Sequence, residues 1–227
     1  MELSEAANLL NKFAGPDLTR TLAKIEASLK GQGNSTCSNA IIECGARNDV
    51  MAAAALLKQV AGQINVVIHA IGILLCLPHL LKNDEIIEYV SLGAGNTGRA
   101  FDLETNQRVA EFKFIRWQGG PEAIRQNALF KDFYLLAEHP SFKSKYLYIL
   151  GTEHALRFLN GRRSIASVLS RHVDLKEQFR LKFGDQYRTV SDYFRPRKGV
   201  VIIEDVSLWL PDLVDPISAG SSRVLGG

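Results

Sequence analysis

The stretch at residues 100–130, AFDLETNQRVAEFKFIRWQGGPEAIRQNALF, decides how the chain is expected to fold. It begins with a short apolar segment containing Asp102, and after a polar break it continues as a longer apolar run, residues 109–117. Residues two apart on a strand point to the same face, so this run predicts that Glu111 and Lys113 project side by side. Its other residues are apolar on both faces, which indicates a strand inside a sheet that is covered on both sides.

Two interpretations of this charged pair are open. In the first, Glu111 and Lys113 lie near a strand end and pair with each other or with neighbouring groups, because a buried unpaired charge is costly. In the second, a hairpin brings Asp102 alongside Glu111, and the two carboxylates offer the oxygen ligands that Mg²⁺ prefers. A lysine beside them can hold or activate a water molecule and can offset charge that builds up on a phosphate.

The order of these residues resembles the PD-(D/E)XK nuclease superfamily. That family carries an aspartate at a strand end, (D/E)xK on the next strand, and then a helix; Asp102, Glu111 and Lys113 stand at those positions. One branch, the RecB-like nucleases, has a glutamine on the helix, and Gln126 matches it. The resemblance covers roughly residues 85–151, where the predicted order is strand, strand, strand, helix, strand, preceded by a helix.

The chain departs from the family pattern at three places. Phe101 stands where a proline is usual, and Phe130 stands where the RecB-like branch has a tyrosine. The helix that precedes the first core strand lacks the glutamate that binds metal in some members. The absent glutamate and the phenylalanine at the tyrosine position lend weight to the alternative of a nuclease-like fold without turnover that binds nucleic acid or a protein partner.

The resemblance implies a fold and a set of roles. The fold is an α/β restriction-endonuclease-like domain, a mixed central sheet flanked by helices, here with a helical N-terminal extension. Asp102 and Glu111 would ligate Mg²⁺, with Mn²⁺ as an alternative, Lys113 would position or activate the attacking water, and Gln126 would orient the site. The implied activity is hydrolysis of DNA phosphodiester bonds, as an endonuclease or an exonuclease.

The whole chain has the composition of a soluble globular protein. It has 227 residues, of which 46% are hydrophobic and 22% charged, so one domain with additions is expected. An odd number of cysteines at no metal-ligand spacing predicts a reducing compartment, and the N-terminus lacks a secretory pattern. We therefore expect an intracellular protein, either cytoplasmic or in the nucleoid or nucleus. The expected parts are a helical extension at 1–62, a nuclease-like core at 63–151, a basic part at 152–217 that completes the same domain, and a disordered tail at 218–227.

Residues 64–81, INVVIHAIGILLCLPHLL, form the most apolar stretch of the chain. Their number approaches the ~20 residues that cross a bilayer, but Asn65, His69, Pro78 and His79 interrupt the apolar sequence. We expect a fully buried core helix rather than a membrane helix, since a helix that is apolar all round is typical of a core. His69 is interpreted as a core histidine with satisfied hydrogen bonds, not as a ligand.

Other segments are predicted from the periodicity of apolar residues and from turn-forming residues. Helical spacing in residues 3–30 is broken at residues 15–17, and strands are expected at 85–92, 145–151 and 200–206. The glycine-rich segment 93–99 has GxGxxG spacing, yet strand-like sequence follows it, which argues against a dinucleotide site. We interpret it as a hairpin loop in which Arg99 is a candidate contact to a DNA phosphate.

Positive charge is concentrated in residues 155–200. This part holds 11 Lys and Arg against four Asp and Glu, 11 − 4 = +7, while the whole chain has a net charge of +3. Clustered Lys and Arg are typical of phosphate binding, and the aromatic residues between them could stack on bases. The alternative is that the charges are solvated and the aromatic residues are core. The candidate nucleic-acid-binding residues are Arg99, Arg125, Arg162 and Arg163. We expect a nucleic-acid partner, DNA, and no membrane partner; a homo-oligomer stays open.

Overall fold

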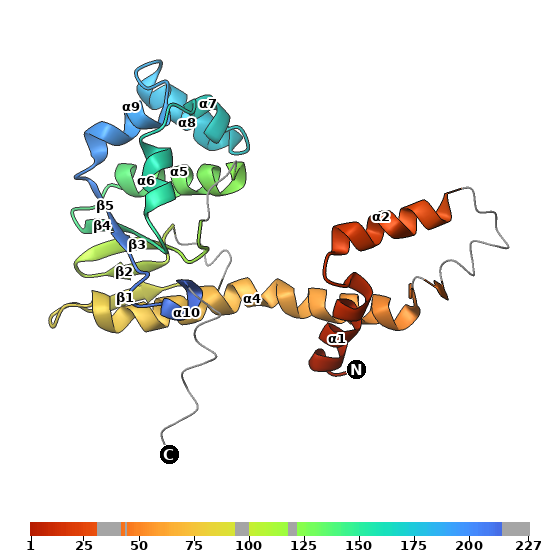
Figure 1. Ribbon diagram of the computed structural model, residues 1–227. Coiled ribbons are helices and arrows are strands. Elements are labelled where there is room, and N and C mark those ends of the chain that lie inside the picture. Colours follow the sequence, from red (N-terminus) through yellow and green to blue (C-terminus); the bar gives the residue numbers. More distant parts are fainter. Residues whose placement is uncertain (31–41, 44, 94–99, 118–121, 215–227) are drawn as a thin grey trace. The chain divides into compact units, whose positions relative to one another are not determined.

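The computed structural model describes residues 1–30, 42–43, 45–93, 100–117 and 122–214 (Figure 1). By its internal contacts the chain divides into two compact units, Met1–Asn65 and Val66–Gly227. The first unit contains α1 (Leu3–Ala14), α2 (Leu18–Leu29) and the start of α4 (Asn48–Leu80), a helix that continues into the second unit.

The break between α1 and α2 lies where the sequence predicts it. Gly15 ends α1 with a φ of 63°, a backbone conformation that favours glycine. Asp17 then begins α2, because its carboxylate accepts a hydrogen bond from the backbone N–H of Arg20 at 3.1 Å. The helix α4 begins at Asn48.

The second unit is built on a five-stranded mixed sheet in the order β1-β2-β3-β4-β5. The neighbours β1–β2 and β2–β3 are antiparallel, whereas β3–β4 and β4–β5 are parallel. The strands are β1 (Ile87–Val90), β2 (Leu103–Thr105), β3 (Arg108–Lys113), β4 (Ser144–Ile149) and β5 (Val201–Asp205). The helices after β3 are α5 (Ala123–Glu138), α6 (Glu153–Leu159), α7 (Ile165–Val168), α8 (Val173–Phe183), α9 (Val190–Phe194), η1 (Arg195–Arg197) and α10 (Pro211–Val214). The expected α/β class, with a mixed sheet, flanking helices and an N-terminal helical region, is confirmed.

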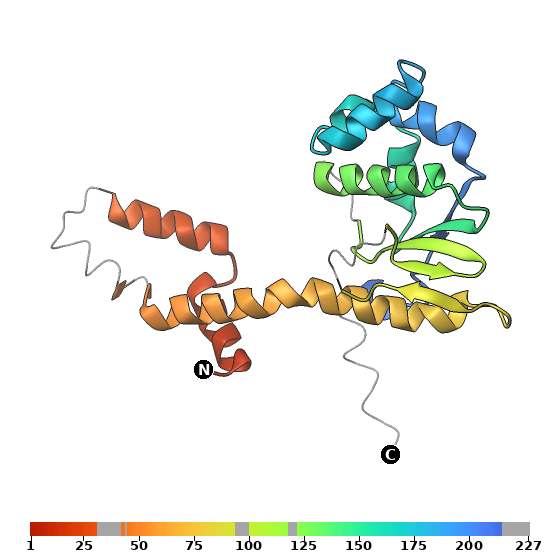
Figure 2. The same cartoon turned by 180° about the vertical axis from the view of Figure 1, so that it is seen from behind.

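The two faces of the sheet belong to two separate cores. On one face α5 covers the sheet and α6–α9 pack beyond it, and on the other face lies the C-terminal half of α4, as both views show (Figures 1 and 2). Val109 points into the α5 core, while Ala110 and Phe112 point into the α4 core. The predicted alternation along β3 is therefore present.

The strand β3 is shorter than expected. The sequence predicts a strand over residues 109–117, but β3 ends at Lys113. Its neighbour β4 ends at Ile149, and the last backbone hydrogen bond between them runs from Leu150 N to Lys113 O at 2.9 Å. Gly151, with a φ of 80°, then turns the chain away, so the residues after Lys113 have no parallel strand beside them.

The expectation that the apolar helix is fully buried is wrong. On α4 only one face is buried, with Ile73, Cys76 and Leu80 packed against the sheet. Apolar residues elsewhere on this helix are at least one-third exposed; they are Ile64, Val66, Val67, Ile71, Leu74 and Leu75. The sheet covers only one side of the helix. The hydrophobicity of the sequence does not show how many sides of a helix are covered by other elements.

In the described part of the chain one helix, α4, is long and apolar enough to cross a membrane, judged by length and composition alone. Its most apolar 18-residue window has a mean hydropathy of 2.1, and 17% of that window is buried.

A close contact between α4 and Phe114, the residue that follows β3, depends on Gly72. A Cβ built on Gly72 would lie 2.8 Å from the ring of the buried Phe114. We expect Gly72→Ala to destabilise the second unit by about 1–3 kcal/mol, because the ring must shift within a packed core. Gly62 on the same helix has open space around its Cβ position, so Gly62→Ala should be neutral or stabilising by up to about 1 kcal/mol. Urea unfolding of both variants checks this, and equal effects would contradict it.

A buried ion pair joins the end of α4 to the sheet. Arg108 and Glu85 are 5% and 8% exposed, and their side chains form two N–H···O contacts of 2.5 Å. The Arg108 guanidinium also donates to the Tyr148 hydroxyl at 2.7 Å and to the Leu80 carbonyl at 2.8 Å, and the Thr105 hydroxyl donates to Glu85 at 2.7 Å. The pair therefore connects α4, the segment before β1, the β2–β3 hairpin and β4.

Candidate functional site

The β2–β3 hairpin brings the two predicted carboxylates together. Its register pairs Leu103 with Ala110 and Glu104 with Val109. The same register carried one residue further places Asp102 opposite Glu111. The Asp102 carboxylate accepts a hydrogen bond from the backbone N–H of Phe112 at 3.0 Å, directly beside Glu111.

His69 on α4 contacts the other oxygen of Asp102. The distance from His69 Nε2 to Asp102 Oδ1 is 3.3 Å, and both side chains are mostly buried. The hydrogen bond to Asp102 raises the pKa of His69 above its ordinary value, although burial opposes this. His69 is thus a satisfied core histidine, as expected, but the group that satisfies it is the candidate metal ligand.

Lys113 is held between two carboxylates on the α5 side of the sheet. Its ammonium lies 2.7 Å from Glu111 Oε1 and 2.8 Å from Asp132 Oδ2. Burial acts to lower the pKa of Lys113, but the charges of Asp132 and Glu111 outweigh it, so the pKa lies above its ordinary value. Lys113 therefore carries a positive charge at neutral pH.

For Glu111, the effect of burial on the pKa outweighs the effect of the neighbouring positive charge. Burial raises the pKa of Glu111 to about 7; the charge of Lys113 opposes this rise, and the charges of Asp132 and Asp102 add to it. Near neutral pH this carboxyl group is therefore divided between its protonated and ionised forms. The first interpretation, in which Glu111 and Lys113 pair near a strand end, is confirmed, while the second, a metal site, stays a prediction.

Two residues of this cluster were not predicted from the sequence. Asp132 is 7% exposed and lies on α5 among buried neighbours such as Phe133. A charged residue on the apolar face of a helix is a signal that it has a partner, but the partner, Lys113, is not evident from sequence spacing. His69 could be recognised in the sequence as a polar residue in an apolar helix. Its partner, Asp102, could not be predicted from sequence spacing.

Gln126 and Arg125 lie on the same helix as Asp132 and have other contacts. Gln126 Oε1 accepts a hydrogen bond from Arg163 at 2.5 Å. Arg125 donates to Glu122 at 2.6 Å and to the carbonyl of Arg116 at 3.1 Å. The α5 residue that contacts Lys113 is Asp132 rather than Gln126.

The donor set fits one particular kind of metal. Asp102 and Glu111 supply two carboxylates, and Mg²⁺ is usually held by one or two carboxylates together with water and phosphate oxygens. Among the residues that the structure describes, no group of three or more His, Cys, Asp or Glu side chains could hold an ion. Asp102 and Glu111 are therefore the residues that could supply oxygen ligands to such a cation.

If Asp102 and Glu111 bind a divalent cation, the pKa of Glu111 predicts how that binding depends on pH. Below a pKa of about 7 the carboxyl is mostly protonated, and a proton competes with the cation for the same oxygens. The apparent affinity for Mg²⁺ should fall by up to about tenfold per pH unit below 7 and level off above it. Titration calorimetry from pH 5.5 to 8.5 measures this.

Asp132→Asn provides the control for this titration. It removes a charge that raises the Glu111 pKa, so the midpoint should move to lower pH. An affinity that does not change over the range, or a midpoint that stays in place in Asp132→Asn, would contradict the assignment.

The aromatic residues of the basic part are core residues. Phe158, Phe179 and Tyr193 are buried in the α5 core, and Phe183 and Tyr187 pack against it. The hypothesis that these residues stack on bases is wrong for Phe158, Phe179 and Tyr193, which are buried, and it stays a prediction for Phe183 and Tyr187, which are partly exposed.

Some basic residues of this part are also occupied. The carboxylate of Glu138 pairs with Lys182 at 2.6 Å and with Arg197 at 2.9 Å. The Arg197 guanidinium also lies 3.9 Å from the centroid of the Tyr193 ring. Arg157 is paired with Glu153 on its own helix. These three cations are engaged in ion pairs and do not form a free positive surface.

Other basic residues of this part form no ion pair in the described ranges. In the described ranges Arg162, Lys176 and Arg188 are exposed and form no ion pair. Arg163, in contrast, donates to Gln126 and lies 3.4 Å from the Ser167 hydroxyl. Arg99 lies outside the described residues.

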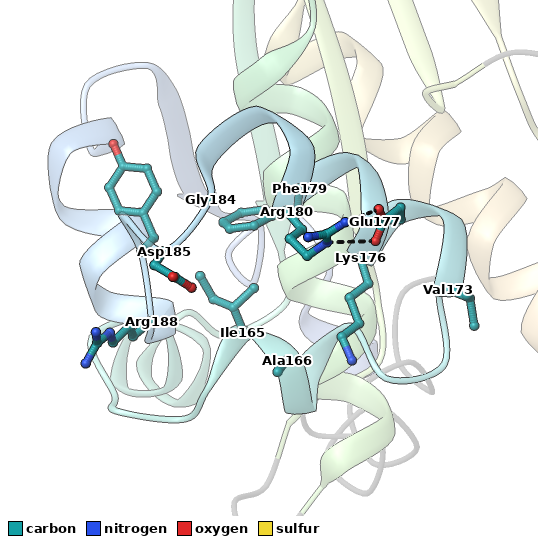
Figure 3. Close-up of a pocket in the computed structure, with 11 residues that line it drawn as sticks. Ile165, Ala166, Val173, Lys176, Glu177, Phe179, Arg180, Gly184, Asp185 and Arg188 are labelled. Atoms are coloured by element: carbon teal, nitrogen blue, oxygen red, sulfur yellow. Dashed lines mark hydrogen bonds and ion pairs between the residues drawn. The ribbon is translucent and has the colours of Figure 1, made fainter.

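An open pocket of about 680 Å³ lies between α7, α8 and the segment before α9. Lys176 and Arg188 line it, together with the Arg180–Glu177 ion pair of 2.6 Å, which Figure 3 marks with dashed lines. Asp185 also lines it, so the lining has three cations and two anions. The pocket is thus a weakly positive hollow in the basic part.

Comparison with protein-family models, with curated proteins and with solved structures finds no match to this chain. The resemblance to the nuclease superfamily therefore rests on the motif residues and on the order of elements alone.

Proposed function

We propose that the protein is a metal-dependent nuclease that hydrolyses DNA phosphodiester bonds. The observation that carries this proposal is the cluster at the β2–β3 hairpin, where Lys113 contacts Glu111 and the charge of Asp102 acts on the Glu111 carboxyl. Each of the three has a defined contact: Asp102 with Phe112 N, and Lys113 with both Glu111 and Asp132. Two carboxylates beside one ammonium group match the needs of phosphate hydrolysis, which are metal ligands and a cation near the developing charge.

Each residue of the chain has a distinct role in this proposal. Asp102 and Glu111 would hold Mg²⁺, which when bound polarises a phosphate oxygen and lowers the pKa of a coordinated water. Lys113 holds the attacking water or offsets charge on the phosphate, and Asp132 keeps its ammonium in place when Glu111 turns to the metal. His69 fixes the orientation of Asp102. These side chains are ordered by hydrogen bonds in the free protein, which reduces the cost of arranging the site.

The test is cleavage of linear duplex, nicked and single-stranded DNA by the full chain with Mg²⁺ or Mn²⁺. Cleavage should need the divalent cation and should stop on addition of a chelator. No cleavage of any of the three substrates with either cation would reject the proposal.

A second candidate is a nuclease-like module that binds nucleic acid without cleaving it. Two observations favour it: Lys113 contacts two carboxylates at 2.7 and 2.8 Å, and the exposed Arg162, Lys176 and Arg188, which we call the unpaired basic group, lie outside that cluster. Such a module would bind DNA with the same salt dependence as the nuclease and would show no turnover.

Both candidates predict salt-sensitive DNA binding through the basic part. Arg162→Glu combined with Lys176→Glu should weaken binding to duplex DNA. It should also reduce the slope of log K against log salt by roughly 0.9 for each phosphate that the variant no longer neutralises. Fluorescence anisotropy at several salt concentrations measures both. Lys24→Glu with Lys58→Glu makes the same charge change at exposed positions of the other unit. An equal loss of affinity in the two pairs would show a general charge effect instead of a binding surface.

A further inference from the structure

The pocket between α7, α8 and the segment before α9 combines an apolar floor with charged sides. Ile165 and Phe179 line it and are 5% and 4% exposed, and we call these two residues the floor of the pocket. Tyr187, which is partly exposed, also lines it. The volume of about 680 Å³ lies within the range of roughly 300–1,000 Å³ that is usual for small-molecule sites. The pocket can therefore hold a ligand that has a ring system.

Backbone hydrogen bonds hold this pocket in shape. The N–H of Ile165 donates to the carbonyl of Arg188 at 3.0 Å, and the N–H of Val190 donates to the carbonyl of Arg163 at 2.9 Å. These two bonds join the start of α7 to the segment before α9, and Phe179 is fixed within the α5 core. A ligand thus meets a surface that is already formed, which lowers the entropic cost of binding.

The charges around the floor favour an anionic ligand. Arg180 donates to both oxygens of Glu177, at 3.0 and 2.6 Å. The hydrogen bond to Glu177 raises the pKa of Arg180, and the charge of Asp185 adds to this rise. Both anions of the lining therefore act on the same guanidinium. The other two cations of the lining, Lys176 and Arg188, form no ion pair within the described residues.

These two cations lie on opposite sides of the floor. Figure 3 shows Ile165 between Lys176 and Arg188. A ligand with a single charged end would contact one of them and leave the other without a partner. A nucleotide inside a strand carries a phosphate on each side of its base and sugar, so it offers an apolar middle between two negative charges.

We propose that this pocket binds one nucleotide of single-stranded DNA. Its base and sugar cover the floor, and its two flanking phosphates contact Lys176 and Arg188. A base inside a duplex is paired and stacked and cannot enter such a pocket, so the site is specific for single strands and unpaired ends. The proposal rests on the nucleic-acid binding that the nuclease and the non-cleaving module share, and it does not require cleavage.

The first experiment measures binding of the full chain to a labelled thymidine strand by fluorescence anisotropy. EDTA is present, so that cleavage does not occur, and the strand has about ten nucleotides, within the range that one single-strand site occupies. The matched probe is a strand of the same length in which every base is replaced by an abasic site, which keeps all the phosphates. The wild type should bind the thymidine strand at least about fivefold more tightly, because only this strand has bases to place on the floor.

Ala166→Trp tests the pocket without a change of charge. Ala166 is exposed and lines the pocket, so a large ring at this position fills it. The variant should bind the thymidine strand no more tightly than the abasic strand. Gln178→Trp on α8 is the matched control, because Gln178 is exposed and does not line the pocket. It should keep the preference of the wild type for the thymidine strand.

Lys176→Met and Arg188→Met test the phosphate contacts and leave the floor intact. Each should weaken binding to both strands and reduce the slope of log K against log salt by roughly 0.7, the value for one phosphate of a single strand. Arg171→Met makes the same charge change at an exposed residue outside the lining, and its slope should stay that of the wild type. Thermal unfolding of each variant at the wild-type temperature shows that the fold is retained.

Three results would overturn the inference. Equal affinity of the wild type for the two strands shows that only phosphates are bound. Equal effects of Ala166→Trp and Gln178→Trp show that the base lies elsewhere. A peptide of alternating Asp and Leu that binds more tightly than the thymidine strand, and does not bind Ala166→Trp, shows that the pocket takes a protein segment.

Cleavage is measured separately with Mg²⁺, so the two proposals can fail independently. A chain that prefers the thymidine strand and cleaves no DNA rejects the nuclease activity and supports the nucleotide pocket. A chain that cleaves DNA and binds the two strands equally rejects the nucleotide pocket alone.

Discussion

Lys113→Met is expected to lower the rate of DNA cleavage by at least about 10³-fold, the size of effect seen when a positioned proton-transfer group or a charge-stabilising donor is removed. The methionine has a similar length and removes only the charge and the hydrogen bonds. Glu111 already has a pKa of about 7, so it takes up a proton when Lys113 is absent and the fold is retained. Single-turnover cleavage at saturating Mg²⁺ measures the chemical step directly.

Lys131→Met is the matched control for this variant. Lys131 lies on α5 with its Nζ 3.8 Å from Asp132 Oδ1. Lys131→Met therefore removes the same charge beside the same carboxylate. Its cleavage rate should stay within a few-fold of the wild type. DNA affinity should be similar in the two variants, because neither belongs to the unpaired basic group. Equal reductions in both variants would show that local charge, not the position of Lys113, governs the rate.

Glu85→Ala is expected to destabilise the second unit by about 3–5 kcal/mol, because it leaves the buried guanidinium of Arg108 without a counter-charge. The double variant Glu85→Leu, Arg108→Met should cost much less than Glu85→Ala, since no unpaired charge remains. Urea unfolding of the single and double variants gives both values. Glu153→Ala, which breaks an exposed pair with Arg157, should have little effect.

The pH dependence of stability provides a second measurement of this pair. Burial acts to raise the pKa of Glu85, but hydrogen bonds from Arg108, Thr105 and the Lys82 backbone outweigh it and hold the pKa below its ordinary value. The stabilisation is therefore present above the ordinary carboxyl pKa and is lost as the pH falls through the lowered one. Glu85→Ala should remove this part of the acid sensitivity. An unchanged acid transition would contradict the assignment.

The hairpin and its carboxylates could be predicted from the sequence because the information is local. The alternation around Glu111 fixes which side chains share a face, and a short polar break fixes the pairing of Asp102 with its neighbour strand. The break between α1 and α2 was predictable for the same reason, since Gly15 and Asp17 act on adjacent residues.

The partners of single buried charges could not be predicted in this way. Arg108 contacts groups 23 and 40 residues away in sequence, and Lys113 contacts Asp132 across a helix. The burial of α4 was overestimated because hydrophobicity is a property of each residue, whereas burial also depends on a facing surface. The aromatic residues of the basic part were misjudged in the other direction. The positive charges around them in sequence suggested that they are exposed and bind bases, but they pack in or against the α5 core.

The hydrogen bond from Phe112 N to Asp102 Oδ2 limits which substitution can test the role of Asp102. This side chain takes the place of a strand carbonyl at the end of the β2–β3 ladder, and its removal in Asp102→Ala leaves a backbone donor without an acceptor. Loss of activity in that variant would combine a broken ladder with a missing metal ligand. Asp102→Asn keeps an acceptor oxygen for Phe112, but it removes the negative charge and replaces the oxygen that contacts His69 with an amide nitrogen. The amide variant therefore preserves the strand ladder, and His69→Ala is the control for the loss of the histidine contact.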